Sequence, residues 1–233
     1  LRARPLRIPC SLFMNSRSHR YLILLMIGLN FSAVSDVVSD GISSSVKRGR
    51  DYLNRNEFNR VWFSYSDTDK ESVSPWKLVD QMEGTAPAEQ QASPILVCSG
   101  KPDGYLRTTE IMEEYSLSLE WRYPRDTHGN SGILLHVSDQ DKVWPESVQV
   151  QLHTPTVGSV FPTSGASTKS ILHPPADLKV NPQEWNRCQI LSAGGNLRVS
   201  FNDLWVGSVE GCEPRRGHIA LQSEGSEVHF RNI

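Results

Sequence analysis

The sequence lacks any excess of glycine or proline, any long apolar run and any block of basic charge. Its 16 Gly and 14 Pro among 233 residues exclude collagenous and low-complexity proteins. Hydrophobic residues make up 38% of the chain and include six Trp, enough to exclude wholesale disorder. After residue 35 the chain has 19 basic and 26 acidic residues. This mildly acidic composition argues against a nucleic-acid partner, because phosphate binding requires clustered Lys and Arg.

The lack of a long apolar run decides the interpretation of the first 35 residues. Arg17 and Arg20 precede an apolar run of eleven residues, 21–31, whereas a membrane-spanning helix needs roughly 20. A positive flank, a short apolar segment and small residues after it are typical of a secretory signal peptide. We therefore expect residues 1–35 to be a signal peptide, with 1–13 an over-extended start or an alternative initiation. The mature protein would be periplasmic or extracellular without a stable membrane span; a buried helix or an uncleaved anchor is the alternative.

Cysteine is scarce, and one of the four, Cys10, lies in the expected signal peptide. The other three, Cys98, Cys188 and Cys212, are an odd number, so an oxidising compartment would allow one disulfide and one free thiol. Their spacing does not say which pair would form a bridge, and three buried thiols are the alternative. No Cys-x-x-Cys or Cys/His spacing predicts a zinc site.

The rest of the chain divides at residue 57. Residues 36–57 are rich in Ser, Asp and Arg with little apolar periodicity, so we interpret them as a linker with at most a short helix. From residue 94, short runs with alternating apolar and polar side chains are separated by turn residues, as in half-buried antiparallel strands. We predict an all-β domain over residues 58–233, with two antiparallel sheets packed as a sandwich. The expected strands cover residues 95–98, 105–108, 115–123, 133–137, 147–153, 185–191, 197–201, 204–209, 217–222 and 227–231.

The polar faces of three expected strands carry side chains suited to a polyhydroxylated ligand. Glu120 and Arg122 share one face of residues 115–122, and His136 lies in the strand that follows. Trp144, in the next connection, could provide an apolar platform for a sugar ring. If these strands are neighbours, the polar groups converge in one cleft. The third strand contributes Gln149, Gln151 and His153.

Each of these residues also has a plainer interpretation. Glu120 and Arg122 can form a solvated surface pair, His136 can be a satisfied edge residue, and Trp144 can pack a loop. Familiar catalytic motifs are absent as well, since the sequence has neither a G-x-S-x-G elbow nor a Gly-rich phosphate loop. Retaining glycosidases need two carboxyls about 5 Å apart, but residues 146–151 (ESVQVQ) carry amides where sandwich glucanases have carboxylates.

Metal binding is a further hypothesis. Glu120, His136 and His153 have side chains that could ligate a divalent metal ion, although no close spacing in the sequence enforces this arrangement.

Several short motifs, taken in order, resemble those of the 3-keto-disaccharide hydrolases, a family of the 3-keto-glucoside lyase/hydratase type. The resemblance covers about residues 58–233. Its motifs are LVCSGKPDGYLRT at 96–108, YSLSLEWR at 115–122, GNSGILL at 129–135, KVWP at 142–145 with VQVQ at 148–151, EWN at 184–186, the hairpin at 196–206, and GHIALQSEG at 217–225 with FRNI at 230–233.

This resemblance implies a jelly-roll sandwich similar to legume lectins and laminarinase-like enzymes, and action on glycans outside the cytoplasm. The reaction would be hydrolysis, or elimination and hydration, of 3-keto disaccharides or glucosides. Gln149 stands where the family often has an acid, and an amide cannot act as a general acid or base. The segment 154–161 likewise replaces a G-D-F-W motif common in the family.

Three functional hypotheses remain open. The first is a hydrolase or lyase with catalytic residues Glu120, His136 and Glu224, in which the imidazoles transfer protons or bind metal. The second is a glycan-binding module without catalysis, and the third is a structural envelope domain without a ligand. For either of the first two, the residues expected to bind the saccharide are Arg122, Asn130, Trp144, Gln149, Gln151 and His153.

Overall fold

The computed structural model describes residues 49–67, 73–80 and 94–233. All of them belong to one compact unit, Val46–Ile233. The expected signal peptide and residues 36–48 of the expected linker lie outside the described residues. Within the described part of the chain, no helix has the length and apolar character needed to span a bilayer.

The described elements are almost all strands. A single short α-helix, α2, and one 3-10 turn, η1, accompany them in the described residues. The elements are α2 (Phe58–Val61), β1 (Trp62–Ser66), β2 (Trp76–Val79), β3 (Ile95–Cys98), β4 (Gly104–Thr108), β5 (Tyr115–Arg122), β6 (Gly132–Val137), β7 (Ser147–Gln151), η1 (Thr154–Thr156), β8 (Val160–Thr163), β9 (Asn186–Ala193), β10 (Asn196–Phe201), β11 (Leu204–Val209), β12 (His218–Ser223) and β13 (Val228–Arg231).

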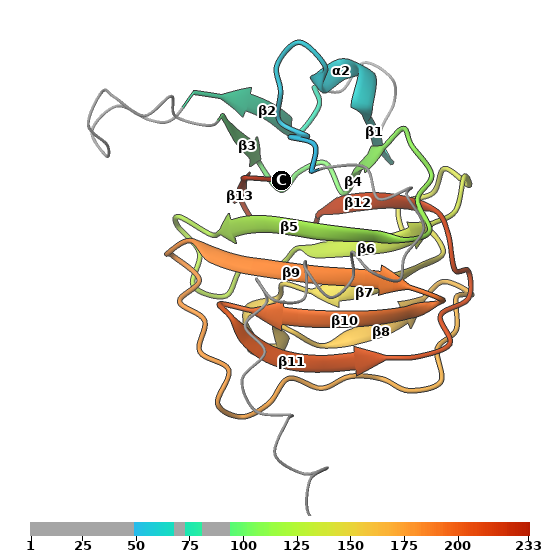
Figure 1. Ribbon diagram of the computed structural model, residues 1–233. Coiled ribbons are helices and arrows are strands. Elements are labelled where there is room, and N and C mark those ends of the chain that lie inside the picture. Colours follow the sequence, from blue (N-terminus) through green and yellow to red (C-terminus); the bar gives the residue numbers. More distant parts are fainter. Residues whose placement is uncertain (1–48, 68–72, 81–93) are drawn as a thin grey trace, which may run out of the picture. The chain divides into compact units, whose positions relative to one another are not determined.

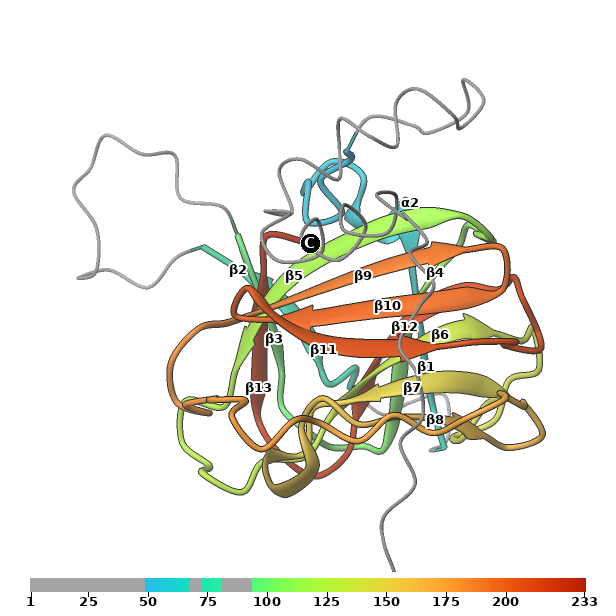
Figure 2. The ribbon, with the colours of Figure 1, turned by 60° about the horizontal axis from the view of Figure 1, so that its bottom comes forward.

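Two antiparallel sheets form a sandwich. The six-stranded sheet has the order β1-β4-β12-β6-β7-β8, and the seven-stranded sheet has the order β11-β10-β9-β5-β13-β3-β2. Figures 1 and 2 show the two layers, with β5, β9, β10 and β11 in one and β6, β7 and β8 in the other. The non-sequential strand order is that of a jelly roll, so the predicted fold class is confirmed.

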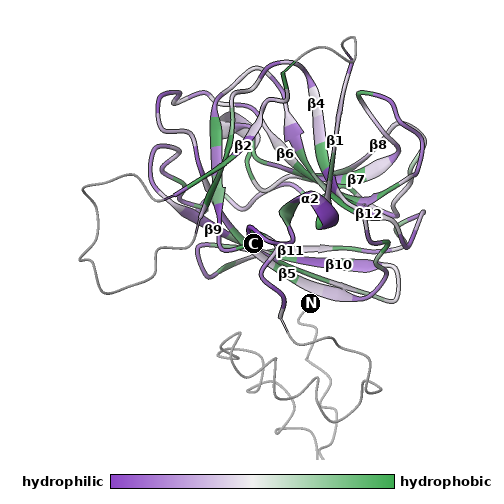
Figure 3. Cartoon of the chain, turned by 90° about the horizontal axis from the view of Figure 1, so that it is seen from above, coloured by the Kyte–Doolittle hydropathy of each residue, from purple (hydrophilic) through white to green (hydrophobic). Residues whose placement is uncertain are grey.

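Alternation of side chains explains how each strand joins the core. In β5, Leu117, Leu119 and Trp121 are buried, whereas Ser116 and Ser118 are exposed. β7 shows the same period, with Val148 and Val150 in the core cluster that the two sheets share. Figure 3 views the two sheets from above and shows apolar and polar residues alternating along the strands. The period of two therefore directs one face of each sheet inward and leaves the other to the solvent.

Three strands were not predicted individually: β1, β2 and β8. Each lies at an edge of its sheet, where one side of the strand has no partner and the apolar pattern is weak. In β1, Phe63 is 39% exposed, and β8 contains Pro162, which edge strands tolerate because it has no N–H to donate.

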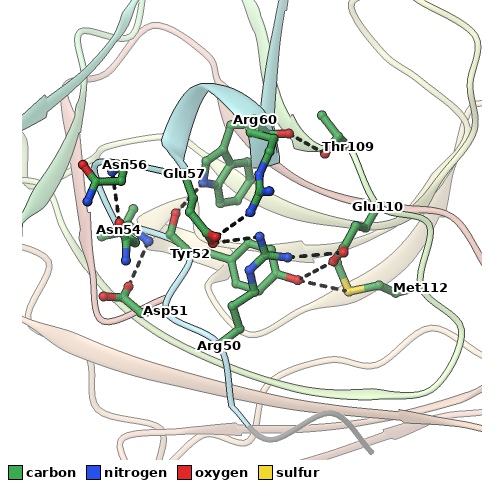
Figure 4. A network of polar contacts seen from close by, with 12 residues as sticks. Arg50, Asp51, Tyr52, Asn54, Asn56, Glu57, Arg60, Thr109, Glu110 and Met112 are labelled. Atoms are coloured by element: carbon green, nitrogen blue, oxygen red, sulfur yellow. Dashed lines mark hydrogen bonds and ion pairs between the residues drawn. The ribbon is translucent and has the colours of Figure 1, made fainter. Parts of the chain in front are cut away.

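The N-terminal part of the domain begins earlier than we expected. Residues 50–57, interpreted as linker, are packed against the sandwich: Leu53 is 1% exposed, and the Tyr52 N–H donates to the carbonyl of Ile233 at 2.9 Å. Figure 4 shows the polar network beside it, in which Arg50 pairs with Glu57 at 2.9 Å and with Glu110 at 3.2 Å. Polar composition concealed this contact, because a single buried leucine gives no periodic signal.

Leu53→Ala tests this domain boundary. Removing a fully buried leucine leaves a cavity, so we expect the free energy of unfolding to fall by about 2–5 kcal/mol. Val73→Ala is the control, since Val73 is 86% exposed. Urea unfolding monitored by tryptophan fluorescence measures both variants, and equal midpoints for the two would show that residues 50–57 are a linker after all.

Candidate functional site

A hollow of about 400 Å³ lies on the outer face of the six-stranded sheet. Gln149 lines it from β7, and its neighbours Val148 and Val150 point to the opposite side, into the core between the sheets. The floor is formed by strands β6, β7, β8 and β12, and the walls by the loop that precedes β6 and the loops that follow β6, β7, β8 and β12. The described lining residues are Asn130, Leu134, Trp144, Pro145, Ser147, Gln149, Gln151, His153, Phe161, Thr163, Ser164, Gln222 and Glu224.

The floor of the hollow is rich in amides because a glycine makes room for them. Gly132 is paired with Gln151 across β6 and β7. A Cβ atom at Gly132 would lie 2.8 Å from both Gln149 Nε2 and Gln222 Oε1. These two amides meet above the glycine, where Gln149 Nε2 donates to Gln222 Oε1 at 3.5 Å. Gln149 is 6% and Gln222 3% exposed, so the strands hold both side chains in place.

One wall carries the carboxyl of Glu224. Partial burial and the nearby charge of Asp103 raise the pKa of Glu224 above its ordinary value. The loop that carries it is held in place by Ser226, which donates to Asp126 at 2.8 Å and accepts from the Asn130 N–H at 3.1 Å. The result is a positioned carboxyl that keeps its proton to a higher pH than a solvated glutamate.

The other lining groups are an imidazole, two aromatic rings and hydroxyls. His153 follows β7, and its backbone N–H donates to Gln151 Oε1 at 2.9 Å. Trp144 is 42% exposed and Phe161 is paired with Gln149 across β7 and β8, so both rings face the same hollow as the amides. Amides and hydroxyls beside aromatic surface are the groups that bind a neutral polyhydroxylated molecule.

The structure brings together six of the nine residues predicted for the site. They come from four loops and one strand, and all of them line the hollow. They are Asn130, Trp144, Gln149, Gln151, His153 and Glu224.

Two predicted residues, Glu120 and Arg122, lie instead in the seven-stranded sheet. Glu120 accepts from Arg231 Nε at 2.7 Å and from Asn232 at 3.0 Å. The Arg122 guanidinium lies 4.5 Å from the centre of the Trp185 ring. The prediction was wrong because it assumed that β5 and β6, which follow each other in sequence, are neighbours in one sheet.

His136 is also misplaced by the prediction, for a different reason. Its φ of 56° and a register shift between β6 and β12 mark a β-bulge, which reverses the side-chain alternation. The imidazole therefore points between the sheets, where it contacts Ser192 Oγ at 3.1 Å and the Pro214 carbonyl at 2.9 Å. Burial lowers the pKa of His136 below its ordinary value, so this group is a structural core residue.

These placements separate the three residues considered for metal binding. Glu120 is in one sheet, His136 is between the sheets, and only His153 lines the hollow. Among the described residues, no group of three or more His, Cys, Asp or Glu side chains is arranged to hold a metal ion. The donor set that we considered therefore does not fit such an ion.

The cysteines of the domain are buried and unbridged. Burial raises the pKa of the Cys98 thiol above its ordinary value and that of Cys212 to about 11. These thiols are packing residues, which is the alternative that the sequence left open.

Several lining residues were not predicted: Ser147, Phe161, Thr163, Ser164 and Gln222. Ser147 and Gln222 alternate with core residues in expected strands, so the alternation marks them as outward-facing. No sequence pattern indicated Phe161 and Thr163, because β8 was not predicted.

Gly132→Ala tests the arrangement of the amides. The added methyl would displace the ends of two flexible side chains rather than backbone. We therefore expect the fold to be retained and the affinity for a neutral polyhydroxylated ligand to fall by up to about tenfold, the equivalent of one hydrogen bond. Gly49→Ala, where nothing lies within 4 Å of the added atom, is the matched control. Calorimetric titration measures the affinity of both variants. Unchanged affinity in Gly132→Ala would show that the two amides do not contact the ligand.

His136→Asn tests the buried imidazole, because asparagine also tolerates the positive φ. Since the folded pKa is lowered, the unfolded chain takes up a proton below about pH 6.5 that the folded protein does not. Stability should therefore fall as the pH falls from about 6.5 towards the folded pKa. In the variant this slope should be smaller by about 1.4 kcal/mol per pH unit, as measured by urea unfolding at several pH values. The lowered pKa of His229 contributes equally to both proteins. Identical slopes would refute the inference that burial lowers the pKa of His136.

Comparison with solved structures supports the fold. A candidate glycosyl hydrolase from Parabacteroides distasonis is 19% identical, with 78% of this chain and 95% of that chain covered and a TM-score of 0.53. The carbohydrate-binding module CBM66 from Bacillus subtilis is 12% identical, with 73% and 92% covered and a TM-score of 0.50. At these identities the likeness shows the sandwich fold alone. None of the curated proteins compared with the sequence matches it.

The family comparison covers nearly the whole described domain. The model of the 3-keto-alpha-glucoside-1,2-lyase-like domain matches residues 37–233, which include both sheets and every described residue of the hollow. The chain therefore belongs to the family of 3-keto-alpha-glucoside-1,2-lyase-like domains.

Proposed function

We propose that this protein binds a 3-keto-glucoside or 3-keto-disaccharide in the hollow and cleaves its glycosidic bond. The observation that carries the proposal is the convergence, in one hollow, of amides, aromatic rings, an imidazole and a carboxyl with a raised pKa. Membership of the 3-keto-alpha-glucoside-1,2-lyase-like family supports the substrate class.

Binding of the sugar would rest on the floor of the hollow. Gln149, Gln151 and Gln222 offer both donors and acceptors, which match hydroxyl and ketone groups. Trp144 and Phe161 offer apolar surface for the C–H face of a sugar ring. The volume of about 400 Å³ is within the range of small-ligand sites.

The chemistry of a 3-keto sugar explains how this hollow could work with a single carboxyl. The ketone acidifies the hydrogen on C2, so a base can remove it as a proton. The electron pair left behind forms a C1–C2 double bond while the C1–O bond breaks, and the leaving oxygen takes a proton from an acid. Addition of water to the resulting enone then yields the free keto sugar.

We assign the acid role to Glu224 and the base role to His153. A carboxyl with a raised pKa keeps its proton to a higher pH than an ordinary glutamate, which suits it to protonate a leaving group. An imidazole is the usual base near neutral pH. This elimination needs neither the second carboxyl of a retaining glycosidase nor an acid at position 149, so Gln149 is compatible with it.

A glycan-binding module without catalysis is the second candidate. Glu224 is the single carboxyl among the described lining residues, and β7 presents amides at Gln149 and Gln151. These groups can form hydrogen bonds with a saccharide without cleaving it.

We also propose that the protein is exported. The basic flank, the short apolar run and the small residues before residue 36 support export. The matched family domain begins at residue 37, close to the expected cleavage position, which is consistent with a separate leader.

Glu224→Gln tests the catalytic assignment. The amide keeps the size of the side chain but has no proton to transfer, so we expect kcat to fall at least about a hundredfold with substrate affinity nearly unchanged. Because the pKa of Glu224 is raised, wild-type turnover should also decline as the pH rises through that pKa. Both are measured by chromatography of the products from a 3-keto-disaccharide.

Glu210→Gln is the control, because Glu210 is an exposed carboxyl that is 4.0 Å from Lys169 and outside the hollow. Full turnover in Glu224→Gln would contradict the acid role. Saccharide binding without any turnover in the wild type would favour the second candidate, and absence of both would refute the proposal.

A further inference from the structure

The loop between β6 and β7 forms the wall of the hollow that carries Trp144. It crosses towards β4 and β12, where two of its aspartates are bound. We propose that Asp139 and Asp141 are positioning residues that hold Trp144 against the hollow and thereby set the affinity for the saccharide. This inference rests on the proposed function for its ligand, while the position of Trp144 can be tested without one.

The first attachment is between Asp139 and His218 of β12. Asp139 Oδ1 lies 2.7 Å from His218 Nε2, and the imidazole is 3% exposed. On the other side of the ring, His218 Nδ1 lies 3.1 Å from the carbonyl oxygen of Glu110. Arg107 Nη1 also lies 3.1 Å from His218 Nε2, so the ring has polar contacts on both sides. The ring is therefore fixed on the sheet, and it offers Asp139 an immobile partner.

The second attachment is between Asp141 and two residues of β4. Asp141 Oδ1 accepts from the Tyr105 hydroxyl at 3.2 Å and lies 3.9 Å from Arg107 Nη2. The Tyr105 side chain is stacked on Tyr65, with ring centres 5.3 Å apart. Arg107 is held under the Phe63 ring at 4.6 Å. Both partners of Asp141 are thus anchored by neighbouring aromatic rings.

The far end of the loop is fixed as well, so Trp144 lies between two fixed points. The Pro145 carbonyl accepts from Ser147 Oγ at 3.1 Å and from Thr163 Oγ1 at 3.3 Å. The Ser138 N–H donates to the Glu146 carbonyl at 3.1 Å, which closes the loop at its base. Trp144 is 42% exposed, so packing alone leaves its indole partly free. Its position depends on the backbone that the aspartates hold.

The exposure of the two aspartates separates an effect on ligand affinity from an effect on folding stability. The side chains of Asp139 and Asp141 are 74% and 46% exposed, although their partners His218 and Arg107 are only 3% and 14% exposed. Replacement by asparagine keeps an oxygen that can accept from these partners, so it costs little folding stability. A displaced contact group, by contrast, weakens binding even when it lies far from the bond that changes. We therefore expect their removal to alter ligand affinity much more than the free energy of unfolding.

The experiment is a double-mutant cycle in the full chain. It combines Asp139→Asn/Asp141→Asn with Trp144→Ala in the Glu224→Gln background, which is expected to bind without cleaving, and calorimetry measures affinity for methyl 3-keto-α-glucoside. We expect the aspartate changes to weaken binding about tenfold when Trp144 is present and to have little effect when it is absent, because coupled groups are not additive. Asp203→Asn is the matched control, since it removes a similar exposed pair with Arg187 on the seven-stranded sheet.

A second measurement does not depend on the ligand. Fluorine NMR of protein labelled with fluorotryptophan reports the environment of each indole, and Trp144→Phe identifies the signal of residue 144. We expect this signal to shift or narrow in Asp139→Asn/Asp141→Asn and to be unchanged in Asp203→Asn.

Each outcome decides one of the two proposals. An unchanged fluorine signal, or an affinity loss that adds fully to that of Trp144→Ala, would overturn the positioning role. If the wild-type protein does not bind the glucoside, the proposed function fails for this ligand, and the fluorine signal still decides whether the aspartates hold Trp144.

Discussion

The two-residue period of the β-strand is the constraint on which this domain depends. In each central strand of the six-stranded sheet, one set of side chains must be apolar enough to pack against the other sheet. The alternate set is then free to vary, and in β7 it supplies Gln149 and Gln151 to the hollow while Val148 and Val150 form core. Core packing thus fixes the backbone that places the polar groups. The hollow is therefore held rigid by core residues that do not line it.

Local departures from this period shape the site as much as the period itself. The bulge at His136 turns a polar side chain into the interior, where Ser192 and the Pro214 carbonyl satisfy it. At Gly132 the side chain is missing altogether, and two amides occupy the space above it. A buried imidazole and a pair of buried amides are each acceptable because hydrogen bonds replace the water they lose.

The electrostatics of the hollow favour a neutral ligand and proton-transfer chemistry. Its described lining contains one carboxyl, one imidazole and no Lys or Arg. The Arg107 guanidinium and the His218 imidazole, on strands β4 and β12, are engaged by the aspartates of the loop that carries Trp144. The aspartates thus contact these groups at the margin of the hollow, and its lining offers mainly amides and hydroxyls to the saccharide that we propose as the ligand.

Sequence patterns alone predicted the all-β sandwich, most of the strands and six of the site residues, which lie on or beside β7 or in the expected loops. Those features follow from local patterns: alternation, turn residues and short motifs. The packing of the folded chain, by contrast, places Glu120 and Arg122 in the other sheet, His136 between the sheets and Leu53 against the domain. Sheet order and bulges depend on which strands pair across long stretches of chain. One strand's own residues do not encode its neighbours, because the same alternating pattern fits either sheet.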